Sequence, residues 1–392
     1  MSQSYWQEQK IPVPAATNTK YDFIIVGGGI AGLSVAYWLQ KENSNFKIAI
    51  LEKATLGYGA SGRNAGFVTC GSTEHFIKLQ EQFGLEKAVE IWKFSEINRE
   101  LLVEQIIQDQ PQDVDYRSTG SCTVAPNLER FGLYQKTAKI MQQNGIDVVE
   151  VNAVAMEKDY GVKNFEGGIQ YAGDGYVHPV KLLSRLYKKL KNVDVHENTD
   201  VSSFSEKNGV QILETSKGVF EAGKIILTLN AYLPLLHKKF EKLITPGRGQ
   251  IILTKPLPHF VKGPCYLTKH LCYFRQLPTG ELLVGGFRNL AVEQENTHVD
   301  ATTEIIQNAL FDFIRNYFTL GAHALIAKQW AGIMGFSSDG QMMMGALQHT
   351  PNVHLMAGCS GHGMGLSFNG ARTLVHSLFG QKIPSHLDVN RF

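Results

Sequence analysis

Three glycines near the start of the chain have the spacing of a phosphate-binding turn. Gly27, Gly29 and Gly32 form the pattern G-x-G-x-x-G directly after an apolar run at 22–26 and directly before helix formers at 33–41. The first glycine permits a tight turn, the second lets the backbone approach a pyrophosphate, and the third lets a helix pack closely on a strand. The helix N-terminus then offers unpaired N–H groups and the positive end of a dipole to the phosphates.

An acidic residue follows at the distance typical of such a turn. Glu52 lies 20 residues after Gly32, at the end of a second apolar run at 47–51, where its carboxylate can accept hydrogen bonds from a ribose. Strand, turn, helix and acid together predict a βαβ unit that binds a dinucleotide. The alternative is a structural βαβ turn that holds no ligand.

The segment after Glu52 is richer in glycine than an ordinary crossover. Residues 57–68 read GYGASGRNAGFV, and Ser61 and Arg63 within it offer donors to phosphate or ring oxygens. Backbone N–H groups in such a loop could line a second, planar part of the cofactor. A flexible surface loop is the alternative. The first turn alone does not distinguish NAD from FAD.

A second glycine-rich segment lies near the end of the chain. An apolar run at 353–357 precedes the glycine-rich residues 358–365, and a helix predicted at 366–379 ends at Gly380. This arrangement again aims a helix N-terminus at a group that needs stabilisation of negative charge. His362 lies in this segment, and we interpret it as a packing or cofactor-contact residue rather than a proton carrier.

Both segments stand out in the composition. The chain has 392 residues and 38 glycines, against about 27 expected from average usage. Nine of them fall in 27–71 and ten in 332–380. Because 43% of the residues are hydrophobic and no short glycine repeat is present, a disordered or collagen-like chain is excluded.

Charge, cysteines and hydropathy narrow the class of protein further. The net charge of +2 gives no global field to collect nucleic acid. Five dispersed cysteines without a C-x-x-C predict neither a disulfide framework nor a zinc site, and we expect no metal. Glycines and Asp22 interrupt the apolar run at 21–39, and residues 1–20 lack a signal-peptide pattern. We expect a cytoplasmic protein with no membrane partner and no nucleic acid partner.

The order of elements predicts an α/β fold (α+β overall) with a discontinuous cofactor domain. Nucleotide-binding patterns occur at both ends of the chain, whereas alternating apolar residues between 248 and 290 predict an antiparallel sheet. The fold is therefore a Rossmann-like domain with an inserted antiparallel-sheet substrate domain. The predicted segments are 21–80, 170–235 and 325–385 for the cofactor domain, 81–169 and 236–324 for the substrate domain, and 1–20 for an N-terminal arm over the surface. Further predicted elements are helices at 82–109 and 181–190 and strands at 193–196, 210–213, 224–229, 250–254, 273–276 and 281–284.

Several segments beyond the first turn carry a more specific pattern. They are 59–68, Tyr273-Phe274-Arg275-Gln276 with 282–286, 330–335, Asp339-Gly340, and Ser360-Gly361-His362-Gly363-Met364. Together with the first turn they resemble the D-amino-acid-oxidase-like (DAO) family of FAD-dependent oxidoreductases, the group that contains glycine oxidase, sarcosine oxidase and gamma-glutamylputrescine oxidoreductase. The resemblance runs from residue 21 to about 380, and the segment 59–68 is most similar to the gamma-glutamylputrescine oxidoreductase branch.

The resemblance implies FAD as cofactor and oxidation of an amine or amino acid. The implied reaction is hydride transfer from the carbon that bears the amine to flavin N5, which gives an imine that hydrolyses in water. Such chemistry needs a neutral amine and correct orientation more than it needs a strong base. The sequence therefore does not identify the catalytic residues. The second glycine segment would face the flavin pyrimidine edge, where fixed N–H dipoles favour the reduced state. The implied cofactor-binding residues are Gly27, Gly29, Ile30, Ala31, Gly32, Glu52, Lys53, Ala60, Ser61, Gly62, Arg63, Asn64, Ala65, Val201, Gly335, Gly361, His362, Gly363 and Met364.

Departures from the family pattern bear on substrate and acceptor. The position of the carboxylate-binding arginine in glycine-oxidase-like members is Met334 here, and a sarcosine-oxidase-like lysine is replaced by Gly365. These losses argue against a small α-amino acid held in the usual way and favour an amine, a polyamine derivative or a larger amino compound. Leu283 stands where the family lysine assists oxygen, so O2 or another electron acceptor is left open. Gly332 stands near the flavin-linking cysteine, so FAD is expected to be non-covalent.

Aromatic and methionine side chains are candidates for the walls of the substrate pocket. They are Tyr273, Arg275, Trp330, Met334 and Met364. Such walls suit an amine with apolar flanking groups, and a tyrosine or tryptophan could stack on a cationic part of it. For Trp330 a core position is the alternative, and for Arg275 a structural ion pair.

Two other functions are compatible with the same sequence. One is a flavoenzyme of this family that modifies tRNA, although the near-neutral charge does not favour it. The other is a flavin-binding protein without turnover, which the lost carboxylate-binding residues would permit. The sequence leaves open the exact substrate, the oligomeric state and the boundaries of the inserted domain.

Overall fold

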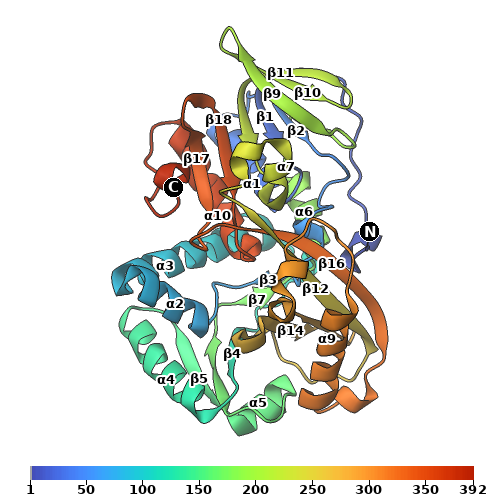
Figure 1. Cartoon of the computed structure of the whole chain (residues 1–392), viewed down its shortest axis with the longest axis vertical. Coiled ribbons are helices and arrows are strands. Elements are labelled where there is room, and N and C mark those ends of the chain that lie inside the picture. The colour runs from blue at the N-terminus through green and yellow to red at the C-terminus, as the bar shows by residue number, and fades with distance from the viewer. Residues whose placement is uncertain (1) are drawn as a thin grey trace.

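The apolar runs predicted as strands at both ends of the chain meet in one sheet. The computed structural model of the chain describes residues 2–392. Five parallel strands follow the order β18, β11, β1, β2 and β8, and β17 pairs antiparallel to β18 at one edge. Figure 1 shows blue β1 and β2 in the same layer as red β17 and β18. The bounds are β1 Lys20–Val26, β2 Ile48–Leu51, β8 Val193–His196, β11 Gly218–Leu227, β17 Met343–Leu347 and β18 Thr350–Ala357.

This first sheet is buried on both faces. Alternate residues of its central strands point to opposite sides, and each side packs in its own apolar cluster. Ile25 packs in an apolar cluster with helices α1 (Ile30–Glu42) and α10 (Gly363–Leu378). Ile24 packs in a second cluster on the other side, together with Phe240. A hairpin of β9 (Val201–Lys207) and β10 (Val210–Thr215) extends the sheet from β11.

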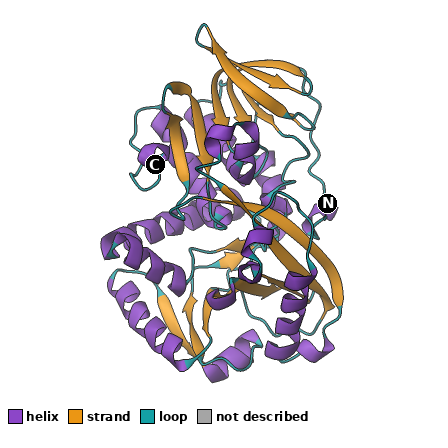
Figure 2. Cartoon of the chain, viewed as in Figure 1, coloured by secondary structure: helices purple, strands orange, loops and turns teal. Residues whose placement is uncertain are grey.

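A second sheet forms the other half of the molecule. Its order is β16, β12, β15, β14, β13, β4, β6 and β5, and every pair in it is antiparallel except β13 with β4, which run parallel. In Figure 2 this sheet occupies the lower half of the view and has helices around it. The expected fold class, a Rossmann-like domain with an antiparallel-sheet domain, is confirmed. The bounds are β4 Ser121–Ala125, β5 Val148–Asn152, β6 Gly167–Tyr171, β12 Thr245–Pro256, β13 Cys265–Leu267, β14 Cys272–Gln276, β15 Glu281–Gly285 and β16 Ile326–Phe336.

The remaining elements connect or cover the sheets. The two-residue strands β3 and β7 pair antiparallel to each other between the two halves. Helix α9 packs on β12 and β15, and α4 packs on β4, β5 and β6. The bounds are β3 Phe67–Val68, β7 Gly175–Tyr176, α2 Thr73–Phe83, α3 Leu85–Leu102, α4 Leu128–Gln143, α5 Ala153–Tyr160, α6 Pro179–Lys188, α7 Leu233–Leu236, α8 Val292–Glu295 and α9 Glu304–Tyr317.

Strand β16 belongs to the second sheet although its residues fall in the segment 325–385 predicted for the cofactor domain. It pairs with β12 along almost its whole length, from Thr245 opposite Phe336 to Thr254 opposite Ile326. An apolar run of this kind does not reveal its partner, because pairing is decided by tertiary contacts. The residue boundaries of the domain division stay a proposal.

The long helix predicted at 82–109 is two helices. Gly84 has φ +82° and separates α2 from α3, because glycine adopts the left-handed region without a steric penalty. The prediction placed the start nine residues too late, since α2 begins at Thr73 after Ser72 caps it through the N–H of His75. After α3 the chain continues as a π-helical turn at Val103–Ile107.

The prediction of a surface arm is wrong for the first residues of the chain. Ser4 and Trp6 are buried, with exposed fractions of 0% and 2%. Ser4 Oγ donates to the Gly62 carbonyl (2.6 Å) and the Trp6 indole donates to the Asn64 carbonyl (2.7 Å). This segment therefore packs on the glycine-rich loop that follows β2, whereas most of residues 7–20 are exposed or half-buried.

The expectations for cysteines, metal-binding groups and membrane-spanning helices concern residues 2–392, the part of the chain that the structure describes. All five cysteines are buried and free. Among residues 2–392 no group of three histidine, cysteine or carboxylate side chains is arranged to hold a metal ion. None of the helices described in that range combines the length and the apolar character needed to cross a membrane.

Candidate functional site

The residues singled out in the sequence lie where the parallel strands of the first sheet end. Gly27 follows β1, Glu52 follows β2, Thr228 follows β11 and Gly358 follows β18. In open α/β sheets, ligands bind outside the carboxyl ends of the strands, where connections turn to opposite sides. The fold therefore brings Gly27 and Gly358, more than 300 residues apart in sequence, to the same end of the parallel strands.

The first glycine turn is built for close contact between backbone segments. Gly27 has φ +113°, and a methyl group on Gly32 would overlap with the Gly27 carbonyl oxygen. The Thr228 hydroxyl donates to the carbonyls of Val26 and Gly27 (3.0 and 3.1 Å). Gly27 and Gly32 are thus required by geometry, and the turn is fixed to the end of β11.

The Glu52 carboxylate holds the turn from the neighbouring strand. Its Oε2 accepts from the Gly28 N–H (2.7 Å) and its Oε1 accepts from the Ala54 N–H (2.9 Å). Burial raises the pKa of Glu52, and these two backbone hydrogen bonds oppose that rise. A carboxylate oxygen has room for a second donor, so Glu52 can also accept from ribose hydroxyls.

Helix α1 begins without a side-chain cap of its own. Its N-cap residue is Gly29, and the Ile30 N–H donates to the Ser61 hydroxyl (2.9 Å) from the loop after β2. A methyl group on Gly29 would lie 2.9 Å from that same hydroxyl oxygen. A helix N-terminus whose N-cap residue is glycine, and beside which lies a small hydroxyl, is suited to an anionic group such as phosphate.

The second glycine segment makes a comparable helix start. Gly358 (φ +71°) and Gly361 (φ +88°) turn the chain from β18 into α10, whose N-cap His362 makes no side-chain capping bond. Asn230 Oδ1 accepts from the N–H groups of Gly358 (3.0 Å) and Cys359 (3.3 Å). Asn230, which directly follows the predicted strand 224–229, thus ties this loop to the end of β11.

Two histidines stack beside this helix start. The rings of His75 and His362 lie 4.7 Å apart at 16°, and His362 Nδ1 is 3.1 Å from the Ser360 carbonyl. Burial lowers the pKa of His75 to about 3 and also lowers the pKa of His362. Both imidazoles are therefore neutral at pH 7. His75 was missed in the sequence because its position in the first turn of α2 carries no motif.

An aromatic wall is formed by Phe67 of β3 together with Tyr266 and Tyr273 of the second sheet. Phe67 on β3 lies 5.2 Å from the ring of Tyr266 and 5.9 Å from the ring of Tyr273, both measured between centroids and both edge to face. Tyr266 and Tyr273 are cross-strand neighbours on β13 and β14, and the Tyr266 and Thr69 hydroxyls share a hydrogen bond of 2.7 Å. Tyr273 was expected near the substrate, whereas Tyr266 was missed.

Comparison with known proteins identifies the family. The family model described as DAO, FAD dependent oxidoreductase, matches residues 22–377. The chain belongs to this family. FAD is therefore its cofactor, and it is an FAD-dependent oxidoreductase.

Relatives cover nearly the whole chain at low identity. The probable oxidoreductase OrdL of Haemophilus influenzae is 25% identical over 391 residues, which cover 95% of this chain and 86% of that protein. Gamma-glutamylputrescine oxidoreductase of Escherichia coli is 24% identical over 372 residues, covering 92% and 84%. The crystal structure of glycine oxidase from Geobacillus kaustophilus matches with a TM-score of 0.78 at 20% identity, over 94% of this chain and 96% of that one. The structural likeness shows the shared fold.

The two helix starts, whose N-cap residues make no side-chain capping bond, fit the two ends of FAD. Glu52, the turn at Gly27–Gly32 and the start of α1 suit the ribose and pyrophosphate. The loop at Gly358–Gly363 and the start of α10 suit a ring edge that gains negative charge on reduction. Of the predicted contacts, Ile30, Ala31, Ala60, Ser61, Gly62, Asn64 and Ala65 lie in α1 or the loop packed on it.

The Arg63 side chain is bound by groups of the protein itself, and its contact with the cofactor stays a prediction. Its guanidinium pairs with Asp300 (3.0 Å) and donates to the carbonyls of Ser2 (2.8 Å) and Ala331 (2.9 Å). These protein groups, which lie far from it in sequence, occupy the donors that were expected to contact the cofactor. Arg63 thereby connects the glycine-rich loop to β16 and to the N-terminal segment.

Lys53 and Val201 lie at the margin of the predicted cofactor site. The Lys53 ammonium pairs with Asp200 (2.8 Å) and its side chain is 73% exposed. Val201 begins β9 and packs against the apolar cluster beneath the first sheet. Side-chain contact of Lys53 with FAD is therefore not supported, because its charge is already paired.

Two of the pocket candidates belong to the core. Arg275 is 1% exposed, donates to the Val177 carbonyl (3.0 Å) and lies over the rings of Trp6 and Tyr176, with its Cζ 5.3 and 4.4 Å from their centroids. Trp330 is 0% exposed and donates to the Arg63 carbonyl (2.8 Å). Neither side chain can line an open pocket.

Met334 and Met364 lie beside the second glycine segment. The Met334 sulfur would be 3.7 Å from a methyl group on Gly361, and Met334 is half-buried. Gly335 accepts from the Ser360 N–H (2.9 Å), which fixes the end of β16 to this loop. Met364 is 9% exposed, and its carbonyl accepts from Asn98 (3.1 Å). A substrate contact of Met334 stays a prediction.

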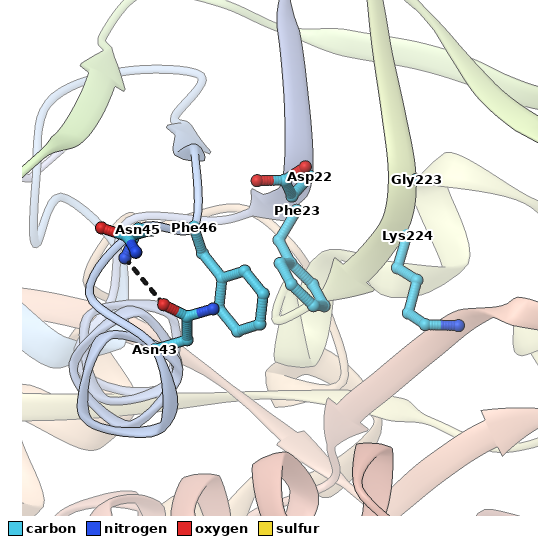
Figure 3. Close-up of a pocket in the computed structure, with 7 residues that line it drawn as sticks. All are labelled: Asp22, Phe23, Asn43, Asn45, Phe46, Gly223 and Lys224. Carbon is cyan, nitrogen blue, oxygen red and sulfur yellow. Dashed lines mark hydrogen bonds between the residues drawn. The ribbon is translucent and has the colours of Figure 1, made fainter.

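A surface hollow of about 390 Å³ lies at the opposite edge of the first sheet. Figure 3 shows it between the start of β1 and the loop after α1, with the rings of Phe23 and Phe46 and the Lys224 side chain along it. Asp22 and Phe23 stand at the amino end of β1, away from the carboxyl ends where the glycine turns lie. This hollow is therefore separate from the site described above.

Proposed function

We propose that the chain oxidises the C–N bond of an amine or amino acid and thereby yields an imine that water hydrolyses. The single observation that carries this proposal is the meeting, at the carboxyl ends of the parallel strands, of two helix starts whose N-cap residues make no side-chain capping bond. Relatives support the substrate class, since they include gamma-glutamylputrescine oxidoreductase and glycine oxidase. FAD, when bound, supplies the two-electron acceptor for this oxidation.

The chain's own residues bind, orient and exclude water. With FAD bound, the N–H groups at the start of α10 would stabilise negative charge at its ring edge. Phe67, Tyr266 and Tyr273 form an apolar face that favours a substrate without surrounding water. The neutral imidazoles of His75 and His362 do not repel a cationic amine as it enters.

The buried Nδ1 of His75 has no hydrogen-bond partner in the described part of the chain. A buried acceptor or donor of this kind is costly unless a ligand or water pairs with it. We propose that this atom holds a hydrogen bond to the substrate amine. Non-covalent attachment of FAD is part of the same proposal.

The experiment begins with the purified yellow protein, from which acid should release FAD into the supernatant. The holoprotein is then mixed anaerobically with a panel of amines, N-methyl amines, polyamine derivatives and amino acids. We expect at least one compound to bleach the visible flavin band. If dithionite bleaches the flavin and no compound in the panel does, the protein binds FAD without this activity. Admission of oxygen to the reduced protein then shows whether O2 reoxidises it.

A further inference from the structure

The glycine-rich loop after β2 is held by two buried indoles that come from opposite ends of the chain. The Trp6 indole donates to the Asn64 carbonyl (2.7 Å), and the Trp330 indole donates to the Arg63 carbonyl (2.8 Å). Trp6 lies in the N-terminal segment and Trp330 lies in β16, and their exposed fractions are 2% and 0%. Two consecutive carbonyls of one loop are therefore bound by donors that are more than 300 residues apart in sequence.

The contacts around Trp6 fix the direction of its indole. Its ring meets the His178 ring edge to face, with the centroids 4.8 Å apart, and the Arg275 Cζ lies 5.3 Å from its centroid. The hydroxyl of Ser4, two residues earlier, donates to the Gly62 carbonyl of the same loop (2.6 Å). Because buried side chains packed in this way keep one rotamer, the indole N–H holds its carbonyl acceptor in one orientation.

A fixed carbonyl also fixes the N–H group of the next residue. The peptide bond is planar, and in its trans form the C=O and N–H bonds point in opposite directions. The described residues contain no cis peptide bond. The Asn64 N–H therefore points away from the indole of Trp330, and the Ala65 N–H points away from the indole of Trp6.

The N–H groups of Asn64 and Ala65 have no acceptor within residues 2–392. Their neighbours in the loop are paired, since the Arg63 N–H donates to the Ala60 carbonyl (3.1 Å) and the Gly66 N–H donates to the Asn64 side-chain oxygen (2.7 Å). Ala65 is 7% exposed, so water has little access to its N–H. A buried backbone N–H without a partner is rare and costly, and an acceptor atom of a ligand removes that cost.

The neighbours of these two N–H groups along the chain lie in the candidate cofactor site. Ser61, three residues before Asn64, accepts from the Ile30 N–H at the start of α1 (2.9 Å). Phe67, two residues after Ala65, belongs to the aromatic wall. Unpaired N–H groups between a residue of the phosphate-suited helix start and a residue of the aromatic wall suit a planar group with acceptor atoms along its edge. The isoalloxazine ring of FAD has this character, because carbonyl oxygens and ring nitrogens lie along its edge.

We propose that Trp6 and Trp330 are positioning residues for the flavin ring. By holding the carbonyls of Asn64 and Arg63, the two indoles direct the N–H groups of Ala65 and Asn64 to acceptor atoms of that ring. The N-terminal segment thus acts on the cofactor through the loop. This inference concerns how the chain holds FAD and does not depend on the proposed oxidation of an amine.

The first test is deuterium exchange in the wild-type protein, with and without FAD, resolved to single amides across residues 60–67. We expect FAD to slow the exchange of the Asn64 and Ala65 N–H groups, because each gains an acceptor. The Arg63 and Gly66 N–H groups are already paired within the loop, so they serve as internal references and should change less. Equal exchange of the Asn64 and Ala65 amides with and without FAD would overturn the proposal. This measurement needs no variant, so it decides the question even where a variant does not fold.

The second test compares Trp6→Phe and Trp330→Phe, which keep an aromatic ring and lose the indole N–H. Sulfite forms an adduct with bound flavin, and the bleaching of the visible flavin band gives its Kd. Hydrogen-bond donors at the ring edge favour this adduct, because it carries negative charge. We expect the Kd of sulfite to rise by roughly 5- to 50-fold in each variant, and the Kd of FAD to rise as well.

Trp92→Phe is the matched control. Trp92 is 1% exposed, belongs to a different apolar cluster and donates from its indole to the Glu96 carboxylate (3.2 Å). This variant loses a buried indole N–H and leaves the loop carbonyls bound, so the Kd of sulfite should not change.

Two results of the variant comparison would overturn the proposal. One is sulfite binding in both Trp6→Phe and Trp330→Phe that equals the wild type, or a loss in Trp92→Phe as large as theirs. The other is a rise in the Kd of FAD alone, with the flavin spectrum and sulfite binding unchanged, because the indoles would then only stabilise the fold.

These outcomes are separate from the reaction, because no amine enters the measurements. A protein with the expected exchange and sulfite binding that no amine reduces would support this inference and contradict the proposed oxidation. Oxidation of an amine by a protein whose loop amides do not respond to FAD would support the reaction and contradict this inference.

Discussion

Glu52 shows how one side chain can serve both the protein and the cofactor. One oxygen of its carboxylate accepts from Gly28 in the glycine turn, and the other accepts from Ala54 in the loop that follows. A methyl group on Gly28 would lie 2.6 Å from Leu56, so the turn, the acid and the loop are packed as one unit. Loss of the carboxylate therefore affects the turn as well as the ribose contact.

We predict that Glu52→Ala weakens FAD binding by at least about 10-fold, because two backbone N–H groups lose their acceptor and each loss costs about 1–3 kcal/mol when buried. Glu52→Gln keeps the shape and one acceptor oxygen and should lose less. Equilibrium dialysis with flavin fluorescence gives the Kd. Unchanged FAD retention in Glu52→Ala would remove the role assigned to this residue.

Residues whose role depends on their neighbours in sequence could be predicted. Residues whose role depends on partners far away in sequence could not. Gly27 and Gly32 are required by a turn of six residues, so their spacing alone indicates it. The partners of the Arg63 side chain, Asp300 and Ala331, were not predicted because they are more than 200 residues away.

At the level of elements, contact between helix and strand decides whether the site forms. Helix α1 reaches the end of β1 only because Gly32 has no side chain to meet the Gly27 carbonyl. Helix α4, in contrast, has a glycine with open space around it, since a methyl group on Gly132 would meet no atom within 4 Å. The two glycines provide a matched pair for substitution by alanine.

We predict opposite effects for the two alanine variants. Gly32→Ala should destabilise the protein by about 1–3 kcal/mol through overpacking and should reduce its FAD content, because α1 must move away from the turn. Gly132→Ala should be neutral or stabilise by up to about 1 kcal/mol through helix propensity. Thermal unfolding and the ratio of flavin to protein absorbance check both. A Gly32→Ala protein with normal FAD content would contradict the assignment of the turn.

Short parallel strands were the elements predicted most accurately, because both of their faces are buried and they read as continuous apolar runs. The predicted runs at 22–26 and 47–51 match β1 and β2 within two residues. The predicted helix 82–109 was wrong at Gly84, where the apolar pattern continues through a turn that only the backbone angle reveals. The sheet to which β16 belongs was not predictable, because strand pairing depends on tertiary contacts.

At the scale of the whole molecule, both ends of the chain meet at one site. Helix α1 packs against α10, and β1 and β18 flank β11 in the first sheet. Ser4 and Trp6 pack on the glycine-rich loop from outside. The cofactor site therefore depends on the complete fold, although each glycine turn is a local sequence feature.

The central claim is that one FAD lies between the two glycine segments, and a crystal structure of the FAD-bound protein tests it most directly. The account predicts the pyrophosphate at the start of α1, the adenosine ribose at Glu52, and the flavin ring between Phe67 and the loop at Gly358–Gly363. A structure with the flavin ring away from the start of α10, or with FAD in the hollow beside Asp22 and Lys224, would contradict it.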